Sequence, residues 1–338
     1  MEKLSIEKRR YIGCKAKLID WIIDTIQYEI PDAKSFCDIF AGTAVVSQRA
    51  IALYEKVIVN DFLYSNNIIY KAFFEDSDYH QEVLDSYVEK YNTISPDSID
   101  ANYFSDNYGD KYFDMASAKR IGFIREDIES HKSELTEKEY CILITSLIYS
   151  IDRIANTLGH FEAYIKKDIK VAEWNYRLID FQCCKNVEIH REDANLLSRE
   201  IKSDIVYVDP PYNSRQYSRF YHVYEVLVKW EKPKLTGAAL KPPTENMSEY
   251  CSSRAVDAFA DLIEHLNTKF IVVSYNNTYH SKSKSSQNKI SLEEILEVLR
   301  KKGKTRMLEH SHKFFNAGKT DFSDHKELLF ITRVDEKE

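Results

Sequence analysis

The stretch Asp204-Ile-Val-Tyr-Val-Asp-Pro-Pro-Tyr212 decides the fold, because an apolar, β-branched run opens directly onto an acid, two prolines and an aromatic ring. The run predicts a buried strand, and in open α/β sheets ligands bind beyond the carboxyl ends of the strands. Pro210 and Pro211 fix the backbone and remove N–H donors, which holds Asp209 and its neighbouring carbonyls as a row of acceptors. With Tyr212 beside them as an aromatic plate, these acceptors suit a flat group that carries an NH2. A strand that simply ends in a tight Pro-Pro turn is the structural alternative.

A second pattern typical of ligand binding lies near the start of the chain. Residues 35–40 (Ser-Phe-Cys-Asp-Ile-Phe) predict a short strand, residues 41–44 a tight turn, and residues 45–54 an amphipathic helix. A strand, a small-residue turn and a helix together bring backbone close to a nucleotide-like ligand. Only eight glycines occur in the chain, which gives Gly42 in this turn more weight. The same pattern also begins ordinary βαβ units that bind nothing.

The strand that follows adds an acid at an informative spacing. Residues 56–61 predict this second strand, and its last residue, Asp61, lies 23 residues after Asp38. In doubly wound folds, an acid about 20 residues further on binds the ribose hydroxyls of a nucleotide. The ordered pair of glycine turn and acid therefore indicates a nucleotide-like cofactor.

Together these motifs resemble those of a known family. Asp38-x-Phe40-x-Gly42 followed by Asp209-Pro-Pro-Tyr212 resembles the motif pair of S-adenosylmethionine-dependent DNA adenine-N6 methyltransferases. Tyr11-Ile-Gly-Cys-Lys15 resembles the amino-terminal motif of the class in which a target-recognition region separates the other two motifs. The catalytic motif continues as Asn213-Ser-Arg-Gln-Tyr217, which resembles restriction-modification enzymes of the D12 family. The match covers most of the chain and departs at Ala44, where many relatives have a second glycine.

For the acceptor, the resemblance implies methyl transfer to adenine N6 after the base has left the duplex. Asp209 and the Pro210 carbonyl would accept the two N6 hydrogens and turn the nitrogen lone pair toward the methyl donor. Tyr212 would hold the ring by stacking, and Pro211 completes the catalytic loop. We expect no metal and no covalent intermediate, because no Pro-Cys nucleophile is present and alignment and electrostatics supply the rate gain.

For the cofactor, the resemblance implies S-adenosylmethionine. Lys15 would reach its methionine carboxylate, and Asp61 would bind its ribose hydroxyls. Phe40 and Gly42 would shape the pocket. Asp193, after a third predicted strand, would contact the cofactor adenine, and capping of the next helix is an equally good role for it. The full predicted cofactor set is Tyr11, Lys15, Asp38, Phe40, Gly42, Asp61 and Asp193.

Composition and charge set limits on this interpretation. With 338 residues and 43% hydrophobic content, the chain can bury a full α/β core and a second subdomain. Its net charge of −7 argues against a general nucleic-acid coat, although a locally basic cleft is compatible with it. Six cysteines show no Cys-x-x-Cys spacing, so we expect neither a zinc site nor disulfides. The sequence predicts no leader and no membrane span, and hence a cytoplasmic protein without membrane partners.

A long insertion separates the two halves of the predicted sheet. More than 120 residues lie between Asp61 and the strand predicted at 188–191, far more than a crossover needs. We therefore expect an inserted, mainly helical target-recognition domain over residues 65–180, and a catalytic cofactor-binding domain from residues 1–64 and 181–338. The insertion is rich in tyrosine and phenylalanine. Aromatic side chains at this density more often form a core than a base-stacking surface.

Basic and amide side chains in two regions are candidates for DNA contacts. Lys166 and Lys167 follow a polar-aromatic stretch, residues 156–164, in which His160 is either a buried hydrogen-bonded side chain or a phosphate contact. Arg and Gln read guanine and adenine edges bidentately, but they also clamp phosphates or pair with acids inside a fold. An irregular arm over residues 233–254 is the alternative place for recognition. The predicted DNA-binding set is Lys166, Lys167, Arg215, Gln216 and Arg219.

The fold predicted from these elements is α/β, with a Rossmann-like, mostly parallel methyltransferase sheet. Residues 304–308 and 327–332 would form its antiparallel edge. The predicted function is site-specific methylation of adenine N6 in double-stranded DNA, as the protective half of a restriction-modification system with a cognate endonuclease as a further partner. The alternatives are cytosine N4, an amine of an RNA base, or a non-catalytic specificity subunit of the same fold. The complete set of motif residues argues against the last.

Overall fold

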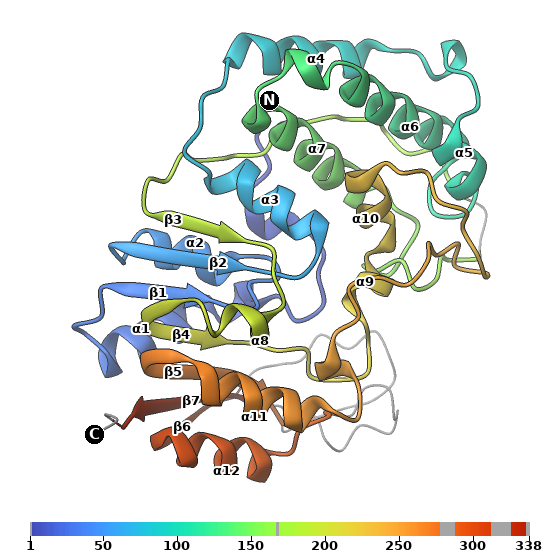
Figure 1. Cartoon of the computed structure of the whole chain (residues 1–338). Coiled ribbons are helices and arrows are strands. Elements are labelled where there is room, and N and C mark those ends of the chain that lie inside the picture. Colours follow the sequence, from blue (N-terminus) through green and yellow to red (C-terminus); the bar gives the residue numbers. More distant parts are fainter. Residues whose placement is uncertain (1, 167–168, 278–287, 312–325, 336–338) are drawn as a thin grey trace. The chain divides into compact units, whose positions relative to one another are not determined.

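The computed structural model describes residues 2–166, 169–277, 288–311 and 326–335. The chain forms two compact units. Figure 1 colours the ribbon by position in the sequence, so the segments of each unit can be found from the colour bar. The helical unit comprises Met1–Cys14, Leu63–Lys185 and Ser218–Glu245. The sheet unit comprises Lys15–Phe62, Asn186–Tyr217 and Asn246–Glu338.

The sheet unit is built on one mixed β-sheet, drawn as arrows in Figure 1. In the described residues its strands are β1 (Ser35–Asp38), β2 (Lys56–Asn60), β3 (Val187–His190), β4 (Lys202–Val208), β5 (Asn267–Asn276), β6 (Gly303–Ser311) and β7 (Lys326–Val334). Their order is β3-β2-β1-β4-β5-β7-β6. The first five pair in parallel, and β7 runs antiparallel to both β5 and β6. This arrangement confirms the predicted mostly parallel sheet with an antiparallel edge.

The centre of the sheet brings two acids to one edge. β1 and β4 are neighbours, and the apolar residues of both strands are almost completely buried. Asp38 is the last residue of β1 and pairs with Tyr207, two residues before Asp209. Because parallel strands end at the same edge, both acids lie where ligands bind in open α/β sheets.

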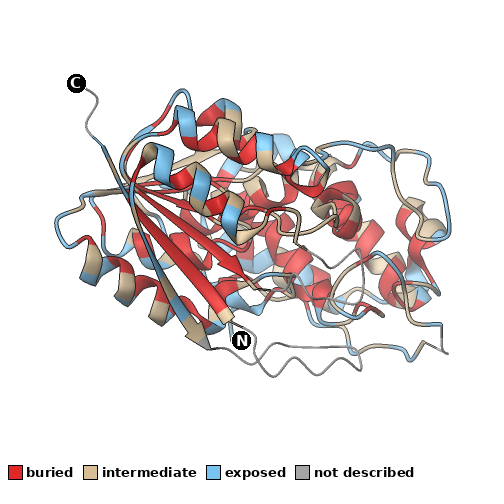
Figure 2. Cartoon of the chain, turned by 90° about the horizontal axis from the view of Figure 1, so that it is seen from below, coloured by how far each residue is buried: buried red, intermediate tan, exposed pale blue. Residues whose placement is uncertain are grey.

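The helices of the sheet unit bury one side of their surface. They are η2 (Lys15–Lys17), α1 (Ile19–Glu29), α2 (Val45–Ile51), α8 (Ala194–Leu197), η5 (Glu249–Cys251), α11 (Ala255–His265) and α12 (Leu292–Lys302). Cys37, Val206 and Ile271, from three strands, belong to one buried cluster with side chains of α8, α11 and α12. Figure 2 shows the strands as buried and these helices with alternating buried and exposed residues. Ser291 and Glu294 form a capping box at the start of α12.

The helical unit contains one helix, α7 (Glu137–Asp152), that is buried along nearly its whole length. The other helices of this region are η1 (Ile6–Lys8), α3 (Tyr64–Phe74), α4 (Gln81–Thr93), η3 (Pro96–Ser98), α5 (Tyr103–Tyr108), α6 (Met115–Ser130), η4 (Lys132–Glu134), α9 (Tyr217–Phe220) and α10 (His222–Lys229). The aromatic side chains of the insertion include Tyr91, Phe104 and Tyr112, which are all completely buried. The prediction that the aromatics form a core is confirmed for these residues.

Residues outside the predicted insertion complete the helical unit. The amino-terminal segment is held by Tyr149, whose hydroxyl donates to the Ile6 carbonyl over 3.0 Å. The segment after the catalytic loop is held by Tyr224, whose hydroxyl donates to Asp152 Oδ1 over 2.6 Å. Both contacts end on α7. The unit is larger than the insertion because a helix buried on all sides needs cover from several parts of the chain.

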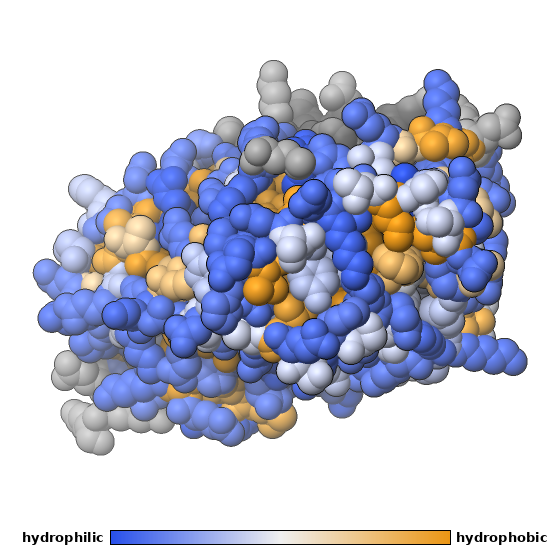
Figure 3. Space-filling model, turned by 90° about the horizontal axis from the view of Figure 1, so that it is seen from above, coloured by the Kyte–Doolittle hydropathy of each residue, from blue (hydrophilic) through white to orange (hydrophobic). Residues whose placement is uncertain are grey.

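Hydrophilic side chains dominate the face of the molecule shown in Figure 3, where apolar side chains gather in separate patches. No helix within the described residues is long and apolar enough to cross a bilayer. This part of the chain also brings no three potential metal ligands together. All six cysteines have free thiols.

Candidate active site

A buried lysine connects the predicted catalytic loop to a carboxylate of β7. The Lys15 ammonium lies 3.0 Å from Asp209 Oδ1 and 2.9 Å from Glu327 Oε1. It also donates to the Tyr212 hydroxyl over 2.6 Å, and this hydroxyl donates in turn to Asp209 Oδ1. Lys15 and Glu327 are only 5% and 4% exposed, whereas the Asp209 side chain keeps 16% of its surface exposed. The carboxylate of Asp209 is therefore fixed from inside and open on one side.

Burial and mutual attraction together set the charge of this cluster. Burial alone would lower the pKa of Lys15, but the carboxylates of Asp209 and Glu327 raise it above its usual range, so the ammonium stays charged. Burial raises the pKa of Asp209, with Lys15 and the Tyr212 hydroxyl opposing this increase and Glu327 adding to it. Burial and the two carboxylates hold the pKa of Tyr212 well above its usual range. Its hydroxyl therefore remains a hydrogen-bond donor.

The backbone of the Asp-Pro-Pro-Tyr loop is anchored at its end. The Tyr212 carbonyl accepts from the Lys289 N–H over 2.8 Å. Pro210 is buried and Pro211 is half-buried. Among the described residues, all hydrogen bonds to the Asp209 side chain engage Oδ1. Oδ2 is thus the oxygen on which a ligand can place an N–H group.

The tight turn after β1 has left-handed backbone at two positions. Gly42 and Ala44 have φ angles of 53° and 58°. A residue with a side chain in this region is uncommon and costs on the order of 1 kcal/mol, so Ala44 adopts the backbone of a glycine at some cost. The Gly42 N–H donates to Asp61 Oδ2 over 3.0 Å. The turn and the acid after β2, which the sequence predicts as separate cofactor contacts, are therefore joined directly.

Asp38 is the buried acid at the start of this turn. It is 1% exposed, and its Oδ2 accepts from Ser47 Oγ over 2.7 Å. Its Oδ1 is buried without a hydrogen-bond partner among the described residues. Burial raises the pKa of Asp38 to about 7, with the hydrogen bond from Ser47 opposing this and the charges of Asp209 and Asp61 adding to it. Buried acceptors normally have donors, so this oxygen fits a ligand that brings an ammonium or N–H group.

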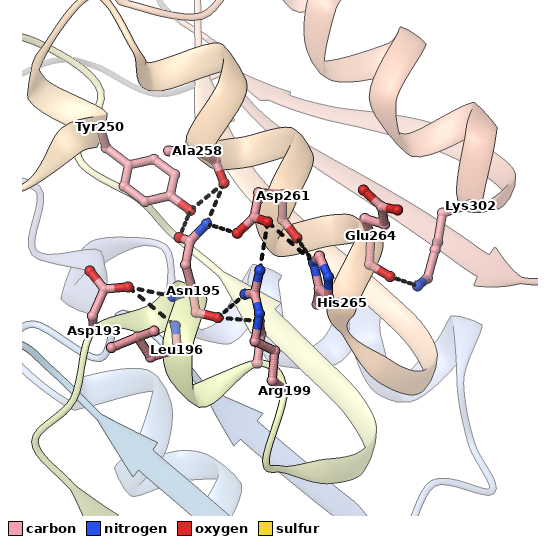
Figure 4. A network of polar contacts seen from close by, with 11 residues as sticks. Asp193, Asn195, Leu196, Arg199, Tyr250, Ala258, Asp261, Glu264, His265 and Lys302 are labelled. Atoms are coloured by element: carbon pink, nitrogen blue, oxygen red, sulfur yellow. Dashed lines mark hydrogen bonds and ion pairs between the residues drawn. The ribbon is translucent and has the colours of Figure 1, made fainter.

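Two further residues of the predicted cofactor set have described structural roles. Phe40 packs against the buried cluster of the sheet and lies edge-on to Tyr250, with 5.1 Å between ring centroids. Asp193 caps α8, because its Oδ1 accepts from the N–H groups of Asn195 and Leu196 over 2.9 and 3.2 Å (Figure 4). The capping role of Asp193 is confirmed, and its contact with the cofactor adenine stays a prediction.

The network in Figure 4 also fixes α8 to α11. Asn195 Nδ2 donates to the Ala258 carbonyl and to Asp261 Oδ2 over 2.8 and 2.7 Å. The Tyr250 hydroxyl donates to Asn195 Oδ1 over 2.8 Å. Arg199 and Asp261 form an ion pair at 2.6 Å. These contacts hold the turn after β3 in place and so give the acid at its start a fixed position.

Tyr11 belongs to an aromatic stack within the helical unit. Its ring lies nearly parallel to that of Tyr221, with 4.5 Å between centroids, and the Arg9 guanidinium lies over it at 4.8 Å. The Ile12 N–H donates to the Tyr221 hydroxyl over 2.8 Å. Packing accounts for this part of the amino-terminal motif. The predicted contact of Tyr11 with the cofactor stays a prediction.

Two of the predicted DNA-binding residues form hydrogen bonds with the backbone of the protein. The Gln216 amide forms two hydrogen bonds with the Ser248 backbone, of 2.9 and 2.8 Å. Arg219 donates to the Pro242 carbonyl over 2.7 Å. Of the remaining three, Arg215 is half-buried, Lys166 is exposed, and Lys167 lies outside the described residues. Contacts of all five with DNA stay predictions.

Sequence reasoning missed the side chains that support the predicted acids. Ser47 donates to Asp38, and Ser274 Oγ donates to Glu327 Oε1 over 3.2 Å. Serines are too common at such positions to give a signal. Glu327 carries a weak signal, since it is an acid at the start of an otherwise apolar strand.

The order of the sheet and the acids at the carboxyl ends of β1 and β4 define an α/β protein of the Rossmann-like class. Residues 11–287 match the model of the D12 class N6 adenine-specific DNA methyltransferases, and the chain belongs to this family. It is 32% identical to the type II methyltransferase M.FokI of Planomicrobium okeanokoites, over 87% of this chain and 47% of that protein. It is 34% identical to the modification methylase StsI of Streptococcus sanguinis, over 79% of this chain and 44% of that protein.

A third relative has nearly the same length. The chain is 30% identical to the type II methyltransferase M.CviAII of Paramecium bursaria Chlorella virus 1, over 96% of this chain and 98% of that protein. By contrast, the chain spans about half the length of the other two relatives. The family match takes in the amino-terminal motif, the glycine turn and the Asp-Pro-Pro-Tyr loop, and it ends before Glu327. The resemblance predicted from the motifs is confirmed.

Proposed function

We propose that this protein transfers a methyl group from S-adenosylmethionine to N6 of adenine at a specific site in double-stranded DNA. The observation that carries the proposal is the fixed carboxylate of Asp209. Lys15 and Tyr212 bind its Oδ1, and its exposed side is left for an incoming amine. The family to which the chain belongs supports the same acceptor.

The acceptor chemistry follows from hydrogen bonding. An adenine in a duplex cannot direct its N6 lone pair at a methyl donor, so the base must leave the stack. Asp209 Oδ2 and the Pro210 carbonyl would accept the two N6 hydrogens and fix the direction of the lone pair. Tyr212 would hold the base by stacking. The chain then needs only to align the two partners and to stabilise charge that develops on nitrogen.

The residues of the glycine turn would hold the cofactor. When bound, S-adenosylmethionine supplies a methyl group activated by a sulfonium. The buried Oδ1 of Asp38, which has no described partner, would accept from the cofactor ammonium. Gly42 would allow close approach of the backbone, Phe40 would form a wall, and Asp61 would bind the ribose hydroxyls.

The proposal extends to recognition of the DNA sequence and to a partner endonuclease. We infer that the helical unit carries target recognition. Lys166, Lys167 and Arg219 of that unit would contact DNA, and so would Arg215 and Gln216 of the sheet unit. The names of the relatives as type II methyltransferases and modification methylases support a protective role beside a restriction endonuclease. Such a role implies a cognate endonuclease that cuts the same site.

One experiment tests the acceptor directly. Purified protein is incubated with methyl-labelled S-adenosylmethionine and a duplex library without added metal, and the nucleosides are separated. We expect labelled N6-methyladenine within one sequence context. The same assay with RNA and with single-stranded DNA identifies other acceptors, and label in N4-methylcytosine or in RNA would overturn the proposal. Asp209→Asn is the matched inactive control, because it keeps the shape of the side chain.

A further inference from the structure

Glu327 is a buried carboxylate that no motif explains. It is the second residue of β7 and is 4% exposed, and β7 pairs with β5 in the sheet unit. Its Oε1 contacts the Lys15 ammonium at 2.9 Å and accepts from Ser274 Oγ at 3.2 Å. A buried carboxylate is costly to keep ionised unless it is paired. A buried carboxylate at this position needs a structural or functional explanation. The family match ends at residue 287 and does not include Glu327.

The Lys15 ammonium has three acceptors around it in this structure, and its predicted contact with the methionine carboxylate of the cofactor stays a prediction. An ammonium has three N–H donors. Three acceptors surround it, namely Asp209 Oδ1 at 3.0 Å, Glu327 Oε1 at 2.9 Å and the Tyr212 hydroxyl at 2.6 Å. Each donor therefore has one acceptor, which fixes where the positive charge sits. Without Glu327, Lys15 would have one carboxylate partner and one donor without an acceptor.

We propose that Glu327 is a positioning residue, which holds the Lys15 ammonium beside Asp209 and prevents it from cancelling the charge of Asp209. This inference rests on the proposed function, since it assigns Glu327 a role in the reaction at Asp209. With one ammonium between two carboxylates, the formal charge of the cluster is −1 rather than zero. Asp209 thereby remains a strong acceptor for the target amine.

The net negative charge matters most during methyl transfer. The N6 lone pair forms the new N–C bond, and the C–S bond breaks with its electron pair going to sulfur. Positive charge develops on N6, which then loses one proton through Asp209 to solvent. A negative cluster in a low-dielectric site stabilises this developing cation, and a neutral one does so less. Glu327 therefore acts on the transition state more than on binding of either substrate.

The groups around Asp209 come from five parts of the sheet unit. They are Lys15 of η2, Tyr207 of β4, Tyr212 of the catalytic loop, Glu327 of β7 and Asp38 of β1. Among these, Glu327 raises the pKa of Asp209, after the larger effect of burial, whereas Lys15 and Tyr212 lower it. Without the charge of Glu327, Asp209 would be the only carboxylate paired with Lys15. The pKa of Asp209 should therefore fall.

The test compares Glu327→Gln with the wild type in two independent measurements. We expect kcat for methyl transfer to fall by about tenfold or more, with KM for DNA and Kd for S-adenosylmethionine changed less than about threefold, because the lost interaction acts on the transition state. The carboxyl ¹³C signal of Asp209, assigned with Asp209→Asn, should titrate at lower pH in E327Q. The acid limb of the kcat profile should move in the same direction.

Two further variants separate this role from a structural one. Glu55→Gln removes the same charge from an exposed pair with Lys34 in the same unit, and it should leave both measurements unchanged. Glu327→Asp keeps the charge and should restore part of the lost kcat. If E327D and E327Q lose activity equally, together with folding stability, or if Asp209 titrates as in the wild type in E327Q, the inference is wrong. If the wild type methylates no nucleic acid, the proposed function is wrong. The titration of Asp209 in E327Q still tests whether Glu327 controls the charge of Asp209.

Discussion

At the scale of single residues, Asp209 is the side chain on which the proposed reaction depends. We expect Asp209→Ala to reduce methyl transfer by at least about a hundredfold, a loss comparable to removal of one preorganised electrostatic contact in other active sites. Its fold should survive, because Glu327 still pairs with the buried Lys15 ammonium. Kd for S-adenosylmethionine, measured by calorimetry, should stay within a few-fold of the wild type.

The matched control for this substitution lies on the surface of the same unit. Asp257 is exposed on α11, and Asp257→Ala should leave turnover unchanged. Turnover by D209A near that of D257A would remove Asp209 from the catalytic assignment. A large loss of cofactor binding in D209A would instead move Asp209 to the cofactor site.

Asp38 should make cofactor binding depend on pH. Its pKa is raised by burial to about 7 in the unliganded protein, so the carboxyl is mostly protonated below that pH. An ionised oxygen is needed to accept from the cofactor ammonium, and binding below pH 7 must therefore first release a proton. We expect the affinity for S-adenosylmethionine to increase as the pH is raised from 6 to 8.

Calorimetry at several pH values in two buffers measures both the affinity and the proton release. Asp38→Asn cannot ionise, so it should bind more weakly and should lose this dependence on pH. If the wild type and D38N show the same pH dependence, another group is responsible and Asp38 does not contact the ammonium.

At the scale of elements, the sequence predicts what local chemistry specifies. The strand before Asp209, the glycine turn and the capping box of α12 all follow from patterns within about ten residues. Lys15 and Glu327 are far apart in the chain, and no local pattern shows that they share one hydrogen-bonded cluster. The same limit applies to Gln216 and Arg219, which the sequence suggests for DNA and the structure shows bound to backbone carbonyls. Contacts between residues far apart in the chain can be identified only from the tertiary structure.

The capping box of α12 gives a prediction for an element away from the chemistry. Ser291 accepts from the Glu294 N–H over 3.2 Å and donates to Glu294 Oε2 over 2.8 Å. Ser291→Ala should lower the free energy of unfolding by about 1 kcal/mol, the usual cost of a lost N-cap. Urea denaturation checks this value, and methyl transfer should be unchanged. Unchanged stability would mean that the helix start is held by packing of Ile295 and Leu299 instead.

At the scale of the whole molecule, the two units suggest a division of labour. All residues of the Lys15–Asp209–Glu327 cluster and of the glycine turn belong to the sheet unit. The helical unit is a separate compact body that includes the predicted recognition segment and part of the arm after α10. Chemistry and sequence recognition should therefore be separable by exchange of segments between relatives.

The structure determines which segments such an exchange must include. Within the helical unit, the Tyr112 hydroxyl donates to the Ala239 carbonyl over 3.0 Å, and His222 Nε2 lies 2.8 Å from the same oxygen. Exchange of residues 65–180 alone would replace Tyr112 while keeping its partner in the arm. We therefore expect that exchange to yield a poorly folded protein. Exchange of all three segments of the helical unit, residues 1–14, 63–185 and 218–245, should yield an active one.

The full exchange should move the methylated sequence while the product stays N6-methyladenine, because base-edge contacts specify the site and the Asp-Pro-Pro-Tyr loop contacts only the flipped base. Modified-base sequencing of DNA from cells that express the chimaera reads both properties at once. The double variant Lys166→Ala, Lys167→Ala is the control, since loss of phosphate contacts should weaken binding to all sequences alike and reduce its dependence on salt. An active chimaera that keeps its original target would place recognition in the sheet unit, even if the chemistry at Asp209 stands.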